Sequence, residues 1–148
     1  MLDDIDLQIL RTLQKKGRTK RNELADEVKL SIPSVSERLN KLEEKKIIDG
    51  YYAKLDRKAF NYDIMAFILV MMDSSKHYKN LILKVEKMPE LLECHDVLGE
   101  GSHLLKAVVK NTEALERVLS EIQSWQGVTG TKTTYVLSTV KETFEISI

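Results

Sequence analysis

The sequence over Gly17–Tyr51 alternates short amphipathic stretches with tight polar turns. Within each stretch, apolar residues recur every three or four positions, which predicts two helices, followed near Tyr51 by a strand. A preceding stretch over residues 3–15 predicts a supporting helix, with Gly17 suited to the left-handed residue that ends it. Two short helices joined in this way are the arrangement with which a small domain places one helix in a DNA groove.

Residues suited to helix caps mark the limits of the second and third helices. Thr19 is a candidate N-cap for a second helix that runs to about Val28. Ser31 is a candidate N-cap for a third helix that runs to about Glu44. Pro33 is tolerated in the first turn of that helix, because the amide it lacks would have no partner there. The sequence therefore predicts a helix-turn-helix.

A helical wheel divides the third helix into an apolar face and a hydrogen-bonding face. Ser, Asn, Arg and Lys are the residue types that read base edges or grip phosphate, and they lie on the outward face of this helix. A merely solvated face is the alternative. The apolar face comprises Ile32, Val35, Leu39 and Leu42. The candidate DNA contacts on the helix and its cap are Ser31, Pro33, Ser34, Glu37, Arg38, Asn40 and Lys41.

The charge distribution favours a DNA contact over a solvated face. No acidic residue lies between Leu7 and Asn22, whereas six basic residues do, and of these Arg18, Lys20 and Arg21 are candidate phosphate contacts. Residues 1–60 carry 14 basic and 11 acidic residues, and residues 61–148 carry 9 and 12. The net charge of zero therefore conceals a basic N-terminal part and an acidic C-terminal part.

The remainder of the chain predicts a separate α+β domain, so we expect a division into residues 1–60 and 61–148. Two successive strand-helix-strand units give a βαββαβ order, which favours an antiparallel sheet with two helices on one face. The expected elements are a connecting strand over Gly50–Leu55, strands over 62–72, 91–98, 104–110 and 130–140, a helix from Ser75 to Lys87, a turn over Gly99–Ser102, and a helix from Thr112 to Trp125.

The first strand of this domain is apolar on both faces, with an unbroken apolar run over Ile64–Met72. A sheet covered by helices on one side is normally wet on the other. A second copy of the chain is the simplest cover for the remaining face, so we expect a homodimer. Shielding by a later strand or by the tail is the alternative. Two related helices about 34 Å apart can read a pseudo-palindrome in double-stranded DNA.

The order and spacing of several short motifs resemble the Lrp/AsnC, or feast/famine, family of regulators over nearly the whole chain. The N-terminal motifs are Leu2-Asp3-x-x-Asp6-x-x-Ile9-Leu10, Gly17-Arg18, Glu23-Leu24-Ala25, Leu30-Ser31-x-Pro33, Arg38-x-x-x-Leu42-Glu43 and Ile48-x-Gly50-Tyr51. The C-terminal ones are Gly99, Ala114-Leu115-Glu116, Gly127-Val128, Thr131, Thr133 and Val140-Lys141. One departure is Lys46, where family members commonly have Gly; a left-handed backbone there would cost about 1 kcal/mol.

The resemblance implies a winged-helix-like DNA-binding domain followed by a ferredoxin-like, ACT-like sensing and oligomerisation domain. It also implies octamers or related assemblies of dimers, and an effector, usually an amino acid, bound between dimers. The residues implied for the effector are Gly99, Glu100, Gly101, Ser102 and His103 in one loop and Thr131 and Thr133 in the last strand.

Three residues of that loop depart from the family pattern. The family often has Asp where this chain has Ser102, an aromatic residue at Gly101 and Tyr at His103. Glycines let backbone amides approach a carboxylate, and Glu100 can pair with an ammonium group. Three alternatives stay open: Glu100 replaces the missing Asp, the ligand differs, or the loop is only a turn.

Other functional classes receive little support. Cys94 and His95 are adjacent on a predicted strand, so their side chains point to opposite faces and do not converge on a metal ion. We find no phosphate-binding loop, paired carboxylates or Ser/His/Asp arrangement, and we expect neither an enzyme nor a cofactor. One cysteine, no signal peptide and no apolar run near 20 residues predict a cytoplasmic protein without membrane contact. The alternative function is a non-DNA interaction or metabolite-binding module that uses the C-terminal domain.

Overall fold

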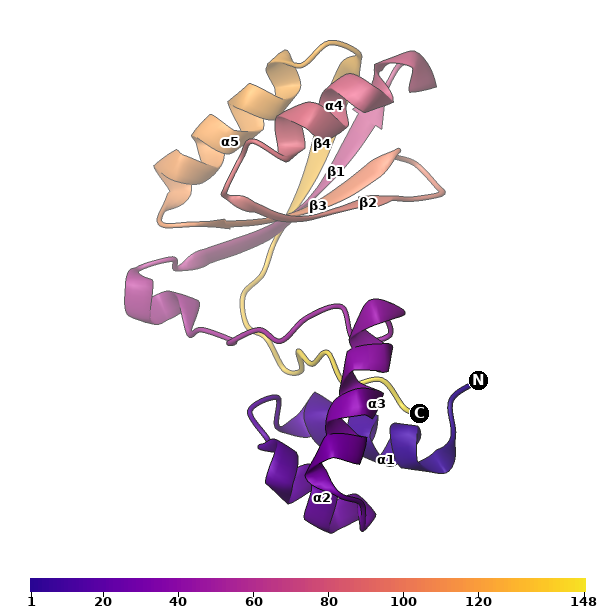
Figure 1. Cartoon of the computed structure of the whole chain (residues 1–148). Helices are drawn as coiled ribbons and strands as arrows, with labels where there is room; N and C mark the ends of the chain where they lie inside the picture. The colour runs from indigo at the N-terminus through magenta and orange to yellow at the C-terminus, as the bar shows by residue number, and fades with distance from the viewer. The chain divides into compact units, whose positions relative to one another are not determined.

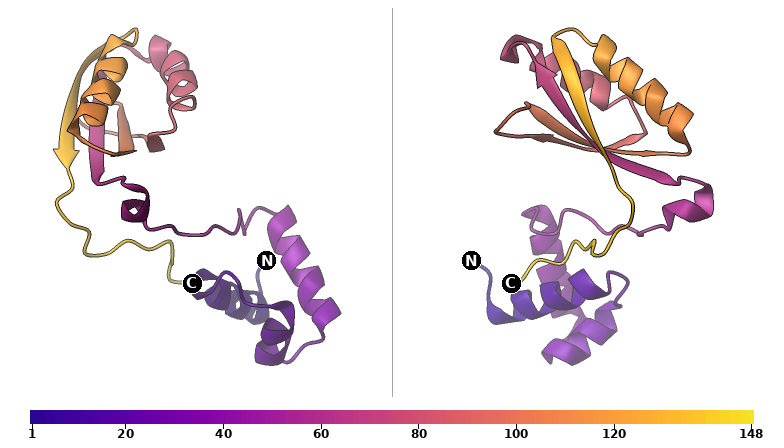
Figure 2. Two further views of the ribbon diagram at one scale, coloured as in Figure 1. Left: turned by 90° about the vertical axis from the view of Figure 1, so that its left-hand side faces the viewer. Right: turned by 180° about the vertical axis from the view of Figure 1, so that it is seen from behind.

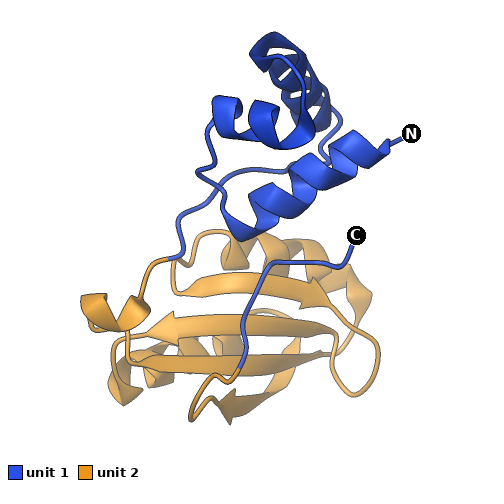
Figure 3. Ribbon diagram, turned by 90° about the horizontal axis from the view of Figure 1, so that it is seen from below, with its two compact units in different colours: residues 1–54, 141–148 blue, residues 55–140 orange.

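The computed structural model describes residues 1–148, which form two compact units (Figure 3). The first unit comprises Met1–Lys54 together with the tail Lys141–Ile148, and the second comprises Leu55–Val140. This differs from a division at residue 60 because the tail returns to bond with the first helix of the first unit. No helix is long and apolar enough to cross a bilayer.

The first unit contains the three expected helices, α1 (Asp4–Lys15), α2 (Arg21–Val28) and α3 (Ile32–Glu44) (Figure 1). Ser31 caps α3 as predicted, since its Oγ accepts a hydrogen bond from the Ser34 amide. Two other end signals are wrong. Lys20, not Thr19, is the N-cap of α2, and the Thr19 hydroxyl donates to the Lys16 carbonyl instead.

The end of α1 also differs from the prediction. Gly17 is not among the residues with a positive φ, and Lys16 is the C-cap of α1, with φ of −139°. Lys29 is the left-handed C-cap of α2, with φ of 57°. Lys46 is left-handed too, with φ of 57°, which confirms that this chain places a side chain where glycine fits better.

The three helices share one apolar core. Leu24, Ala25 and Val28 of α2 and Val35 and Leu39 of α3 pack around the fully buried Ile9 of α1. Only the first residue of the predicted apolar face of α3 departs from it, because Ile32 remains 49% exposed at the helix start. Since α3 is anchored along this single face, its opposite face stays open to solvent.

The predicted strand over Gly50–Leu55 does not form, and this segment is irregular. Tyr51 ties it to the end of α3 by donating a hydrogen bond to Glu43 Oε1 at 3.0 Å. Burial, followed by the hydrogen bond to Glu43, raises the pKa of Tyr51 to about 12. A strand forms only as part of a sheet, and this segment belongs to none, although Lys54 pairs with Glu142 of the tail at 3.0 Å.

The second unit confirms the predicted α+β fold, with two differences in the elements. The segment expected as a helix from Ser75 begins as a 3₁₀ turn and becomes α-helical only at Tyr78, and the last strand ends at Tyr135 and not near residue 140. The elements of this unit are the 3₁₀ turn η1 (Arg57–Phe60), β1 (Ile64–Met72), the 3₁₀ turn η2 (Ser75–His77), α4 (Tyr78–Val85), β2 (Leu91–Asp96), β3 (His103–Val109), α5 (Thr112–Ser124) and β4 (Val128–Tyr135). The four strands form one sheet in the order β2-β3-β1-β4, with every neighbouring pair antiparallel. Helices α4 and α5 lie on one face of this sheet (Figures 1 and 2).

Alternation along β1 sorts its residues between the two faces of the sheet. Ile64, Ile68 and Val70 belong to the core beneath the helices, together with Leu81 of α4 and Ile122 of α5. The residues between them, Met65, Phe67, Leu69 and Met71, point to the other face, which no helix of the unit covers. The apolar run therefore supplies a core on one side and an apolar surface on the other.

Candidate nucleic-acid interface and effector loop

The outward face of α3 is a row of polar side chains on a firmly anchored helix. Pro33, Glu37, Asn40 and Lys41 are exposed, and Ser34 is partly buried. The hydroxyls of Ser31 and Ser34 lie 2.8 Å apart, and the Ser34 amide donates to Ser31 Oγ at 3.3 Å. Ser31 and Ser34 are thus engaged in capping the helix, whereas the following turns present the exposed side chains of Glu37, Asn40 and Lys41.

Glu37 and Lys41 form an ion pair one turn apart on that face. Lys41 Nζ donates to Glu37 Oε1 at 2.6 Å, and both side chains are more than 60% exposed. The hydrogen bond from Lys41 holds the pKa of Glu37 below its ordinary value. Such an exposed pair is weak, so either group can exchange its partner for a base edge or a phosphate.

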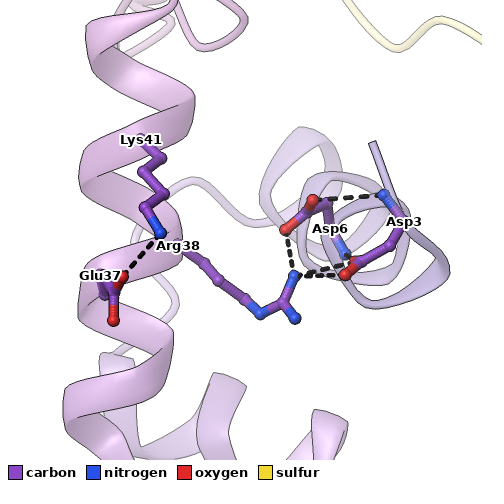
Figure 4. Close-up of polar contacts among 5 residues, drawn as sticks. All are labelled: Asp3, Asp6, Glu37, Arg38 and Lys41. Atoms are coloured by element: carbon purple, nitrogen blue, oxygen red, sulfur yellow. Dashed lines mark hydrogen bonds and ion pairs between the residues drawn. The ribbon is translucent and has the colours of Figure 1, made fainter. Parts of the chain in front are cut away.

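Arg38 has a different environment, although it follows Glu37 directly. Its guanidinium Nη1 donates to both carboxylate oxygens of Asp3, at 2.9 and 2.7 Å, and to Oδ1 of Asp6 at 2.7 Å (Figure 4). The side chain is 28% exposed. The structure therefore separates Arg38 from the outward row and directs it to the start of α1.

Beside this contact lies an open groove of about 430 Å³. Ser34, Glu37, Arg38 and Lys41 of α3 line it together with Asp6 of α1. The groove brings four of the sequence-predicted residues of α3 to one surface. Asn40 is exposed but does not line it.

The predicted phosphate contacts lie at the start of α2. Arg18, Lys20 and Arg21 are all exposed. Glu23 is the only acidic residue in the first turn of α2, where its carboxylate accepts from the Lys20 amide at 2.8 Å and pairs with Lys16 at 3.8 Å. The bond from the Lys20 amide, followed by the charge of Lys16, lowers the pKa of Glu23. The helix start thus carries a cap and a basic surface together.

In the second unit, the loop over Gly99–Ser102 is held close to β1. A Cβ atom on Gly101 would lie 2.5 Å from Leu69 Cγ and 2.9 Å from the Val70 carbonyl oxygen, so only glycine fits this approach. The Ser102 amide donates to the same carbonyl at 2.9 Å. Gly99 has a φ of 127° with open space around it. The loop is therefore shaped by backbone contacts with β1.

Glu100 projects from this loop to an ion pair with Lys132 of β4. That hydrogen bond lowers the pKa of Glu100. Lys132 was not predicted, because no spacing in the sequence links it to Glu100, 32 positions away. Lys132 faces Leu69 across the β1–β4 pairing, on the sheet face that the helices leave open.

The two threonines lie on the other side of β4. Thr131 and Thr133 pair with Val70 and Ile68, both core residues on the helix side. Gln123 of α5 donates to Thr131 Oγ1 at 2.9 Å. The structure therefore groups Glu100 with Lys132 and directs the two threonines to the opposite face.

His103 is fully buried at the start of β3. Its Nδ1 lies 2.8 Å from Ser102 Oγ and its Nε2 lies 2.9 Å from Asp96 Oδ1, while Tyr78 packs edge-on against the ring. These contacts keep the imidazole in the core beneath the loop. Cys94 is partly buried against the same core, and no group of three or more His, Cys, Asp or Glu side chains is placed to hold a metal ion.

Comparison with protein families gives matches to both units. A model described as the Lrp/AsnC ligand binding domain matches residues 65–146, and one described as a winged helix-turn-helix DNA-binding domain matches residues 2–49. The junction between the matches falls where α3 has ended and β1 begins.

Curated relatives and solved structures match the chain over nearly its whole length. The HTH-type transcriptional regulator FL11 of Pyrococcus furiosus is 34% identical over 148 residues, which cover 100% of this chain and 97% of the relative. The leucine-responsive regulatory protein of Rhizobium meliloti is 34% identical, with 99% and 96% covered. Among solved structures, the transcriptional regulator NMB0573 of Neisseria meningitidis in complex with L-Met superposes with a TM-score of 0.93 at 32% identity, covering 99% of this chain and 97% of that one.

Proposed function

Because the chain belongs to the Lrp/AsnC family of transcriptional regulators, we propose that it binds specific operator sequences through α3 and senses an amino acid with its second unit. The observation that carries the DNA-binding part is the solvent-exposed polar face of α3. Asn40 and Lys41 on this face have the donors and acceptors that read base edges in the major groove. Glu37 can accept from a cytosine amino group.

The basic surface at the start of α2 provides the non-specific part of the affinity. Arg18, Lys20 and Arg21 are exposed, and each phosphate they neutralise releases counterions. In a helix-turn-helix, the helix before the recognition helix crosses the phosphate backbone. The location of these residues at the start of α2 fits that geometry.

The open face of the sheet supports a homodimer. Phe67, Leu69 and Met71 of β1 lie on this face, where Leu104 of β3 is the partner of Leu69 and Lys106 is the partner of Phe67. Covering a few hundred Å² of apolar surface at about 25 cal/mol per Å² contributes several kcal/mol. A symmetric dimer presents two copies of α3 to the two halves of a pseudo-palindrome, and further association of dimers follows the family pattern.

The Glu100–Lys132 pair supports an amino acid as effector. The neighbouring structure from Neisseria meningitidis contains L-Met. In this chain, an ammonium group can pair with Glu100 and a carboxylate with Lys132, so a zwitterion can replace the exposed ion pair that the two residues form with each other. Glu100 then performs the task for which the family often uses the Asp that is Ser102 here.

DNA binding is tested by selecting duplexes from a random library and measuring affinity by fluorescence anisotropy over a range of salt concentrations. We expect enrichment of a pseudo-palindromic sequence and a steep fall of affinity with salt. Lys41→Ala should weaken binding of the selected duplex, whereas Lys79→Ala, which removes an exposed lysine from α4, should not. Failure to enrich any sequence, with weak and salt-independent binding, would favour a module that acts without DNA.

Effector binding is tested by thermal shift with each of the 20 amino acids. A ligand that binds only the native state raises its melting temperature. We expect a rise with at least one amino acid, lost in Lys132→Ala and retained in the Lys79→Ala control. A blank result with all 20 would reduce the second unit to an architectural role.

A further inference from the structure

The bonds of Arg38 define a compact charged cluster on the flank of α3. Asp3 and Asp6 surround one guanidinium nitrogen of Arg38 with three contacts between 2.7 and 2.9 Å (Figure 4). The cluster joins the middle of α3 to the first turn of α1, across 32 and 35 positions of sequence. We call these three residues the carboxylate clamp.

The two aspartates of the clamp are themselves fixed by the backbone. Asp3 Oδ1 accepts from the Asp6 amide at 2.8 Å, and Asp6 Oδ2 faces the Asp3 amide at 3.3 Å, which makes a capping box at the start of α1. Arg38 therefore binds to a rigid pair of carboxylates and not to freely rotating side chains. The clamp is half-sheltered, because the side chains of Asp6 and Arg38 are only 15% and 28% exposed.

The neighbours of Arg38 on α3 are much more exposed to solvent than Arg38 is. Glu37 and Lys41 are 69% and 61% exposed and bond only to each other. Arg38 leaves the helix on its flank and turns to α1, and two carboxylates there outweigh its single positive charge. The clamp by itself therefore carries one net negative charge, and a phosphate would have to displace these carboxylates to bind the Arg38 guanidinium.

We propose that Arg38 is a positioning residue, held by Asp3 and Asp6, that sets the orientation of α3 on α1 and makes no contact with DNA. This inference depends on the proposed binding of DNA through α3. The apolar core alone leaves a helix some freedom to roll and slide over its neighbours. A charge-assisted link on the flank, one turn from Lys41, restricts that freedom where the helix meets DNA.

The two possible roles of Arg38, positioning α3 and contacting phosphate, predict opposite changes in the affinity for DNA when Asp6 is replaced by Asn. If Arg38 touches phosphate, Asp6→Asn removes a competing and repelling carboxylate, so affinity for DNA should rise. If Arg38 positions α3, the same substitution loosens the clamp, and affinity should fall. Asn retains an oxygen that can accept from the Asp3 amide, so the capping box need not be lost.

Asp4→Asn is the matched control. Asp4 lies in the same first turn of α1 and carries the same charge, but it is outside the clamp. This variant measures how the loss of one negative charge near DNA changes the affinity when the clamp is intact. The experiment uses the full chain and the selected duplex, with anisotropy titrations over a range of salt concentrations.

We expect Asp6→Asn and Arg38→Gln each to weaken binding about fivefold to tenfold relative to Asp4→Asn, and the double variant to be no weaker than the worse single variant. The slope of log affinity against log salt should be the same for Arg38→Gln as for the unsubstituted protein, because no phosphate contact is lost.

The proposal would be overturned if Asp6→Asn bound DNA as tightly as Asp4→Asn or more tightly. It would also be overturned if the slope of log affinity against log salt were about 0.9 smaller in magnitude for Arg38→Gln than for the unsubstituted protein. Thermal melts establish whether each variant folds. If Arg38→Gln does not fold, the affinity of Asp6→Asn for DNA tests the proposal on its own. If the unsubstituted protein enriches no duplex, the proposed function fails first, which is a separate outcome.

Discussion

The carboxamide of Gln14 and the backbone of Ile146 exchange two hydrogen bonds. The Ile146 amide donates to Gln14 Oε1 at 2.7 Å, and Gln14 Nε2 donates to the Ile146 carbonyl at 3.0 Å. Arg11 Nε also donates to the Ile148 carbonyl at 2.7 Å, and Lys54 pairs with Glu142 at 3.0 Å. The tail that follows the second unit is thus part of the first unit and is bonded to side chains of α1.

Gln14→Leu should release the tail from α1, because Leu is similar in size but has neither the donor nor the acceptor. Two hydrogen bonds of about 1 kcal/mol each are lost, so we expect faster hydrogen exchange at the Ile146 amide by about tenfold or more. NMR or mass-spectrometric exchange measures this directly. Gln8→Leu is the control, since Gln8 bonds to Glu27 and not to the tail. Equal protection of Ile146 in both variants would show that the tail is held in another way.

Lys46→Gly should stabilise the first unit. Lys46 has φ of 57°, a conformation that costs an L-residue about 1 kcal/mol and glycine almost nothing. The gain is reduced by the greater freedom of glycine in the unfolded chain. We therefore expect a rise in the denaturant midpoint equivalent to a few tenths to 1 kcal/mol. Lys45→Gly, at the adjacent position with φ of −79°, should destabilise the protein instead. A loss of stability in Lys46→Gly would contradict this account.

Gly101→Ala should disrupt the loop over Gly99–Ser102, because the added Cβ would lie 2.9 Å from the Val70 carbonyl oxygen and 2.5 Å from Leu69 Cγ. Backbone atoms cannot give way as a flexible side chain does, so the loop must move. We expect a lower melting temperature and loss of the thermal shift with the amino-acid effector. Gly130→Ala is the milder control, since its Cβ would meet only the end of Met71 at 3.4 Å. Equal effects of the two substitutions would refute the tight approach of the loop to β1.

Acid should weaken the carboxylate clamp in a pH range that follows from the pKa of Asp3. The bond from the Asp6 amide, followed by the bond from Arg38, lowers the pKa of Asp3 from its ordinary 3.8. A carboxyl with a lowered folded pKa contributes stability above its unfolded pKa and loses it as pH falls through the folded value. The difference in melting temperature between the unsubstituted protein and Asp3→Asn should therefore be constant at neutral pH and shrink below about pH 3.8. A difference that stays constant down to about pH 2 would exclude a role for the Asp3 charge.

Local sequence signals were enough to predict an element when residues within that element determine its structure. The cap at Ser31 and the apolar spacing of Val35, Leu39 and Leu42 predicted α3 to within a residue at its start, and the βαββαβ order gave the second fold. Predictions failed where the structure of a segment depends on a partner far away in the sequence. The segment after Gly50 has a strand-like sequence, but it joins no sheet.

Side-chain partners were the least predictable part of the site. Arg38 is one position from Glu37, and a helical wheel cannot show that Asp3 and Asp6 capture it from another helix. The same holds for the pairing of Glu100 with Lys132, 32 positions away, and for the burial of His103, whose residue type is common on surfaces. Such contacts depend on the register and packing of whole elements, which pairwise spacing does not contain.

The central claim is that α3 lies against duplex DNA. Hydrogen–deuterium exchange of the full chain with and without the selected duplex tests it most directly. We predict slower exchange in peptides that cover residues 31–44 and 18–23, with no slowing over α5. Slower exchange confined to the second unit, with residues 31–44 unchanged at saturating DNA, would contradict the claim.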